Sequence, residues 1–263
     1  MANKYLARDD APFGSEIWEK LDATMKEAAK SQLIGRRLLH IEGPFGLGLK
    51  GVPLKDVEGD SGMIASQFLP VPLIQEFFTL GMRDLANYEG QSIALDTQAV
   101  AQAAKACARK EDDLIFNGAP GVPGLMTAED ANSIKLSDWS EVGTAANDLI
   151  QAVTALDSAG FHGPYTLALA PERFNLLYRL YPRGRQSEIE HLKMLVTDGI
   201  FKAPGLEGGG VLLASGRQFA TIVLGQDMTI GFIGPDGDKI EFSISESLVP
   251  RIRRPQAICV LKG

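Results

Sequence analysis

Apolar positions recur at helical spacing in two long segments of the chain. In residues 15–34 they fall three or four positions apart, which is the period of one helix face. Ser15 is placed to cap this helix, and Gly35 to end it. A second such pattern, with an alanine-rich face, covers residues 97–117 and follows Asp96 as a capping residue. The sequence therefore predicts two amphipathic helices.

The segment between these helices has no helical period. Residues 46–72 are rich in glycine and proline, and a stretch of this length without its own helix is unusual inside a compact domain. We expect a long extended hairpin here, of the kind that reaches a neighbouring molecule. Residues 73–80 read as a strand that follows it.

The rest of the chain mixes helix and strand patterns. Residues 119–225 alternate between the two, whereas residues 239–245 show strict apolar–polar alternation, which is typical of a half-buried strand. A last apolar strand is expected at residues 257–261. The order of elements predicts an α+β protein whose first subdomain is discontinuous in sequence.

Composition narrows the class of protein. The chain has 263 residues, of which 45% are hydrophobic and 22% charged, as in ordinary globular proteins. A net charge of -7 argues against general nucleic-acid binding, which depends on basic contacts to phosphate. Two cysteines, Cys107 and Cys259, are too few for a disulfide framework or a four-cysteine zinc site. Without an apolar leader or a long uncharged apolar run, we expect a cytoplasmic protein with no membrane partner.

Two glycine-rich motifs resemble those of enzymes. Residues 46–51 spell G-x-G-x-x-G, but neither the preceding strand nor the following helix that would hold a phosphate is indicated. Residues 59–62 resemble the nucleophile region of serine proteases, with Ser61 as the nucleophile, yet no suitably placed triad partners are evident. Both motifs are better explained as turns in a glycine-rich loop.

The remaining charged residues suggest no catalytic centre. His40, His162 and His191 lack the spacing of metal ligands, and the run 111–113 of three carboxylates is expected on a solvated or interface face. Clusters of arginine are expected at salt bridges or interfaces. The sequence therefore predicts no catalytic residue, no metal and no cofactor, and this favours a structural or binding role.

Five sequence blocks, in their order and spacing, indicate a family. They lie within residues 11–262 and are 31–37 (SQLIGRR), 42–46 (EGPFG), 111–118 (EDDLIFNG), 163–167 (GPYTL) and 224–231 (LGQDMTIG). In these blocks the chain resembles encapsulins, bacterial and archaeal shell proteins related in fold to the major capsid proteins of tailed phages.

The resemblance implies a tailed-phage major-capsid-type α+β fold, with peripheral domain, axial domain, extended loop and N-terminal helix. The expected divisions are an N-terminal arm and helix that starts the peripheral domain (1–45), the extended loop (46–72), the peripheral domain with its spine helix (73–118), the axial domain (119–225) and return strands of the peripheral domain (226–263).

The resemblance also implies a function. The chain is expected to be a structural shell subunit that self-assembles, in sixty copies or a multiple, into an icosahedral cytoplasmic nanocompartment. Its partner would be a cargo enzyme, either a ferritin-like iron-oxidising protein or a dye-decolourising peroxidase, held through the C-terminal targeting peptide of the cargo. This implies a role in iron storage or oxidative-stress defence, with no nucleic acid bound.

Candidate site residues follow from the same resemblance. The positions matching the cargo-peptide groove are Met25, Ala29, Leu33, Arg36, His40, Ile230 and Ile240, although each apolar one could equally be part of the core. The five-fold pore would be bordered by Tyr181, Arg183, Arg185 and Gln186. Two alternatives remain open: a prophage major capsid protein that holds DNA, and a peptidase or bacteriocin that uses Ser61.

Overall fold

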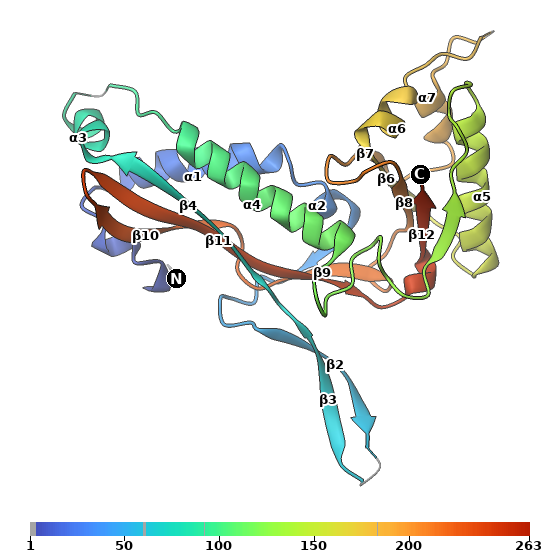
Figure 1. Ribbon diagram of the computed structural model, residues 1–263, viewed down its shortest axis with the longest axis horizontal. Coiled ribbons are helices and arrows are strands. Elements are labelled where there is room, and N and C mark those ends of the chain that lie inside the picture. The colour runs from blue at the N-terminus through green and yellow to red at the C-terminus, as the bar shows by residue number, and fades with distance from the viewer. Residues whose placement is uncertain (1–3, 60–61, 92, 183) are drawn as a thin grey trace. The chain divides into compact units, whose positions relative to one another are not determined.

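Two units divide the chain in the computed structural model, which describes residues 4–59, 62–91, 93–182 and 184–263 (Figure 1). Unit 1 comprises the described residues of segments 1–33, 43–111 and 224–248, and unit 2 those of segments 34–42, 112–223 and 249–263. Helix α4 (Gln98–Asn117) and strand β11 (Lys239–Ile252) each contribute residues to both units.

In unit 1, β11 pairs antiparallel with both β4 (Leu73–Gly81) and β10 (Thr229–Asp236). The alternation read at residues 239–245 is confirmed, since Ile240, Phe242 and Ile244 are buried. Phe242 lies opposite Phe78 and stacks on it with ring centroids 5.0 Å apart. This aromatic pair marks the core of unit 1.

Helices of unit 1 include α1 (Ser15–Lys30), α3 (Met82–Gln91) and most of α4. The predicted helix at 97–117 is confirmed, and the Asp96 carboxylate accepts a hydrogen bond of 2.9 Å from the backbone N–H of Gln98 at its start. Sequence reasoning missed α3, which buries a single residue, Leu85, and so has no apolar stripe to detect.

An N-terminal arm precedes α1, with short 3-10 turns at Lys4–Leu6 and Arg8–Asp10. The guanidinium of Arg8 lies 4.1 Å from the ring centroid of Trp18 and forms an ion pair of 2.8 Å with Asp22, so both contacts hold the arm against α1.

The predicted hairpin at 46–72 is confirmed. Strands β2 (Gly51–Glu58) and β3 (Ile64–Pro70) pair antiparallel, with a register shift between Pro53 and Asp56. Apart from Val52 and Leu69, the side chains of both strands are exposed or only partly buried. A two-stranded ribbon of this kind has no core of its own.

Unit 2 contains a five-stranded mixed sheet in the order β5-β12-β8-β6-β7. Its strands are β5 (Asn132–Lys135), β6 (Tyr165–Leu169), β7 (Ile200–Lys202), β8 (Gly210–Ala214) and β12 (Ile258–Lys262). Two further strands, β1 (His40–Glu42) and β9 (Ala220–Leu224), pair in parallel. Helices α2 (Gly35–Leu38), α5 (Thr144–Ser158), α6 (Pro171–Leu176) and α7 (Glu188–Leu192) complete the unit, with a 3-10 turn at Pro255–Ala257.

The core of unit 2 surrounds the fully buried Trp139. The Asp148 carboxylate on α5 accepts hydrogen bonds from the Trp139 indole (2.8 Å) and from both the backbone N–H (2.7 Å) and the hydroxyl (2.9 Å) of Ser137. This buried carboxylate therefore fixes the loop that follows β5 onto the core, and its polar partners are satisfied.

The two units divide the chain differently from the expected domains, since segments 34–42, 112–118 and 249–263 belong to unit 2 although all three were expected in the peripheral domain. Residues 226–263 were assigned together as return strands, but segment 249–263 belongs to unit 2. The reason is strand pairing, because β12 lies between β8 and β5 in the unit 2 sheet.

The first helix also ends earlier than predicted. Helix α1 stops at Lys30, Ser15 is its first residue and Gly14 stands at the N-cap position. Gly35 begins helix α2 and does not terminate α1. No helix among the described residues is long and apolar enough to cross a membrane.

Candidate docking and assembly surfaces

The structure buries four of the positions predicted to contact a cargo peptide. Met25 and Ala29 on α1, Ile230 on β10 and Ile240 on β11 are at most 4% exposed in unit 1. Side chains buried to this degree have almost no surface that a ligand could contact. Burial therefore favours the alternative that these four residues belong to the core of the fold and do not contact a cargo peptide. Leu33, which follows α1, is partly exposed.

The other two predicted contacts lie in unit 2. Arg36 on α2 is partly exposed, and His40 at the start of β1 is exposed and stands opposite Thr221 of β9. Leu33, Arg36 and His40 are thus the predicted contacts that have side-chain surface available to a ligand.

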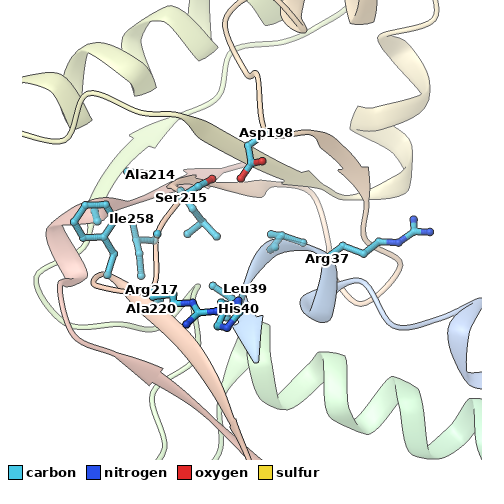
Figure 2. A pocket seen from close by; sticks show the side chains of 14 residues that line it. Arg37, Leu39, His40, Asp198, Ala214, Ser215, Arg217, Ala220 and Ile258 are labelled. Carbon is cyan, nitrogen blue, oxygen red and sulfur yellow. The ribbon is translucent and has the colours of Figure 1, made fainter. Parts of the chain in front are cut away.

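A cleft of about 390 Å³ lies beside His40 in unit 2 (Figure 2). It is lined by residues 37–40, the turn between β8 and β9, Asp198 and the start of β12. Sequence reasoning did not find it, because its polar side chains come from separate turns and share no motif. The only prior signal was His40 itself.

Tyr181, Arg185 and Gln186 of the predicted pore residues are part of a tight loop in unit 2. Leu180 and Ser187 form a β-bridge at its base, and the N–H of Tyr181 donates to the carbonyl of Gln186 (3.2 Å). Arg185 and Gln186 are exposed at the tip, whereas Arg183 lies outside the described residues.

An ion pair and hydrogen bonds hold the base of this loop in place. The buried Glu188 carboxylate forms an ion pair of 3.1 Å with Arg179 and accepts a hydrogen bond of 2.6 Å from the N–H of Gly143. Tyr181 Oη lies 2.9 Å from His191 Nδ1. Partial burial, and then the charge of Glu188, raise the pKa of Tyr181, so its hydroxyl stays neutral and can act as a donor.

The β2–β3 hairpin carries an apolar surface on unit 1. Met63, which precedes β3, is 71% exposed, and Ile64 and Phe68 on β3 are 66% and 61% exposed. Exposed apolar side chains gathered on one ribbon are typical of an interaction surface.

Of the two enzyme-like motifs, the structure describes the first in full and the second only in part. After Gly46, the G-x-G-x-x-G segment turns and enters strand β2 at Gly51, so it is followed by a strand and not by the helix that a dinucleotide-binding motif requires. In the G-D-S-G motif, residues 60 and 61 lie outside the described part. Within that part, no group of three or more His, Cys, Asp or Glu side chains could hold a metal ion.

The expectation that the acidic run 111–113 lies on a solvated or interface face is wrong for two of its three residues, since only Asp113 is exposed. Glu111 and Asp112 are buried, not solvated. The Asp112 carboxylate accepts hydrogen bonds from the backbone N–H groups of Ile34 (3.0 and 3.1 Å) and Gly35 (2.9 Å), at the start of α2. A residue on α4 thus satisfies backbone donors at the start of another helix, which stabilises the N-terminus of α2.

Solved structures define the class of protein to which this fold belongs. The chain is similar in structure to the virus-like particle from Pyrococcus furiosus (TM-score 0.79, 24% identity, 94% of this chain and 100% of the other). It is also similar to the capsid of Myoviridae phage XM1 (TM-score 0.65, 13% identity, 88% and 91%). The fold is therefore that of tailed-phage major capsid proteins.

Sequence comparison then identifies the family. Residues 3–249 match the model of Linocin_M18, described as an encapsulating protein for peroxidase. The chain is 32% identical to the type 1 encapsulin shell protein EncA of Myxococcus xanthus (strain DK1622), over 98% of this chain and 96% of the relative. It is 33% identical to a diheme-cytochrome-encapsulin shell fusion protein of Kuenenia stuttgartiensis, over 94% and 73%. The chain belongs to the encapsulin shell protein family, as the sequence blocks predicted.

Proposed function

We propose that the chain is the shell subunit of an icosahedral nanocompartment of sixty copies or a multiple, and that this compartment holds a cargo enzyme. The observation that carries the proposal is the capsid fold together with a family match over nearly the whole chain. The apolar surface of the β2–β3 hairpin supports it, because a neighbouring copy would cover side chains that the single chain leaves exposed.

The cargo is proposed to be a ferritin-like iron-oxidising protein or a dye-decolourising peroxidase. The family description names a peroxidase, and a relative in Pyrococcus furiosus is a ferritin-like-encapsulin shell fusion protein. Such a compartment would serve iron storage or oxidative-stress defence in the cytoplasm. The shell itself would contribute enclosure and no catalysis.

Cargo capture is proposed to use the cargo's C-terminal targeting peptide. Leu33, Arg36 and His40 are the predicted contacts with available surface, and they offer one apolar, one cationic and one imidazole side chain to the peptide. Weak single sites would suffice, because many identical sites on one inner wall raise the effective concentration. Arg185, Gln186 and Tyr181, with Arg183, are proposed to border the five-fold pore.

Negative-stain electron microscopy of the chain expressed alone tests assembly. Uniform, hollow, thin-walled particles are expected, and their diameter distinguishes sixty copies from a larger multiple. A monomer or small oligomer at every salt concentration and pH tried would contradict the proposal. Nuclease-protected DNA inside the particles would instead favour a prophage capsid.

Capture is tested by co-expression with a fluorescent protein that carries the last residues of a candidate cargo encoded beside the shell gene. Fluorescence should co-sediment with the particles and fall in an Arg36→Ala variant. Equal loading of a fluorescent protein without the peptide would show that capture does not depend on a targeting peptide.

A further inference from the structure

The cleft beside His40 in unit 2 has polar ends and an apolar wall (Figure 2). Its volume of about 390 Å³ falls within the range of roughly 300–1,000 Å³ found for small-molecule sites. Apart from His40, its residues have no part in the proposed peptide docking or pore. The cleft therefore needs an explanation of its own.

One end of the cleft is basic. Arg217, in the turn between β8 and β9, lies with His40 along the lower side of the cleft in Figure 2. The carbonyl of Arg217 accepts a hydrogen bond of 3.1 Å from the Arg253 guanidinium, which anchors the turn. Among the described residues the Arg217 side chain has no ion-pair partner. A guanidinium beside an imidazole N–H is a suitable donor pair for a carboxylate.

Arg37 has a different orientation although it also lines the cleft. Its guanidinium points away from the other labelled side chains in Figure 2 and lies 5.9 Å from the ring centroid of Phe201. The basic end is therefore assigned to Arg217 and His40.

The opposite end has a carboxylate and a hydroxyl. Asp198, just before β7, and Ser215, just after β8, lie along the upper side of the cleft in Figure 2. Ser215 Oγ is buried and has no hydrogen-bond partner among the described residues. Buried hydroxyls in folded proteins are nearly always paired, so this atom points to a missing partner. An amine or hydroxyl group of a ligand could donate to both side chains.

The wall between the two ends is apolar. Ala214, Ala220 and Ile258 line it and are each at most 7% exposed. A hydrocarbon body would remove this wall from water, whereas a highly polar body would gain nothing from it.

We propose that this cleft binds a small amphoteric molecule with an apolar body. Its carboxylate lies against Arg217 and His40, and its amino or hydroxyl group lies against Asp198 and Ser215. The ligand class is that of amino- or hydroxycarboxylates whose two polar groups are separated by a short hydrocarbon chain.

Saturation-transfer NMR on the purified particles tests this with four probes of similar length. Two probes have a polar group at each end: 6-aminohexanoate has an amine and a carboxylate, and 6-hydroxyhexanoate has a hydroxyl and a carboxylate. The other two have one polar group each, which is the carboxylate in hexanoate and the amine in hexylamine. At least one two-ended probe should bind about tenfold more tightly than hexanoate and hexylamine, since one charge-assisted contact contributes about that factor. The two-ended probes compared with each other distinguish an amine from a hydroxyl ligand.

Substitutions at the two ends of the cleft test whether the probe binds there. Arg217→Gln and Asp198→Asn should each lower the affinity for the two-ended probe about tenfold. Arg83→Gln, on the exposed surface of α3, should leave this affinity unchanged. Neither Arg217 nor Asp198 is a proposed peptide contact, so loss of probe binding with intact cargo loading separates the two sites. Equal binding of all four probes, no binding of any, or unchanged binding in both cleft variants would overturn the proposal. The four-probe comparison needs only the unmodified chain, so it stands even if a variant fails to fold.

Discussion

The β2–β3 hairpin of unit 1 and the five-stranded sheet of unit 2 are both held by regular backbone pairing, yet their side chains differ in burial. Every residue of β6 and of β8 is buried, whereas β2 and β3 each bury one residue. Backbone hydrogen bonds alone contribute little net stability, and burial of apolar surface supplies most of it. A single copy of the chain thus contains what stabilises the unit 2 sheet but not what stabilises the hairpin.

The largest expected effect comes from placing a charge on the hairpin. Phe68→Glu should abolish particle formation, because a charge buried at a contact between copies carries a large desolvation cost. The circular dichroism spectrum should be unchanged, since Phe68 is 61% exposed in the single chain. Sedimentation velocity and negative-stain microscopy measure the outcome.

Phe68→Tyr is the matched control, because it keeps the aromatic ring, and it should still form particles. Uniform particles from Phe68→Glu would show that the hairpin surface is not an essential contact between copies.

A core truncation in unit 2 should have the next largest effect. Leu167→Ala removes a fully buried side chain from β6, which lies between β7 and β8, and should lower the free energy of unfolding by about 2–5 kcal/mol. Val57→Ala on β2, where the side chain is 39% exposed, should change it by less than about 0.5 kcal/mol. Urea unfolding in the Phe68→Glu background measures both without a contribution from assembly.

Similar losses of unfolding free energy in Leu167→Ala and Val57→Ala would contradict the difference in burial between the unit 2 sheet and the hairpin. They would indicate that the hairpin is already packed in the unassembled chain.

The same contrast explains how much the sequence could predict. The alternation of Ile240, Phe242 and Ile244 and the glycine–proline content of 46–72 are local signals, and both identified the correct element. Asp112 was misjudged because its role depends on Ile34 and Gly35, which are distant in sequence. Side-chain identity alone does not reveal such a long-range partner.

Segment 249–263 was misassigned for a related reason. Its apolar residues predicted a strand correctly, but the choice of sheet depends on pairing with β5 and β8. The cleft residues Asp198, Ser215 and Arg217 were not found at all, because two turns that are distant in sequence bring them together. Local periodicity therefore identified elements, the family resemblance identified the fold, and neither located the polar groups of the cleft.

The two cysteines allow the units to be compared directly, since Cys107 is buried in unit 1 and Cys259 in unit 2. Burial raises the pKa of the Cys259 thiol to about 11, so about one molecule in a thousand is ionised at pH 8. Burial, and then the nearby Glu246 carboxylate, raise the pKa of Cys107 still further above its usual range. Both thiols should therefore resist a disulfide reagent at pH 8 in the native particle and react at least a hundredfold faster once exposed.

Two single-cysteine variants, labelled across a urea series, then report on each unit separately. Cys259→Ser keeps Cys107 of unit 1, and Cys107→Ser keeps Cys259 of unit 2. Cys107 should become reactive at a lower urea concentration than Cys259, because β4 and β10 of unit 1 leave more side chains exposed than β6, β8 and β12 of unit 2. The expected difference is small, since α4 and β11 contribute to both units and couple their unfolding. Simultaneous labelling would show that this coupling makes the chain a single cooperative unit. Earlier labelling of Cys259 would reverse the stability order inferred from burial.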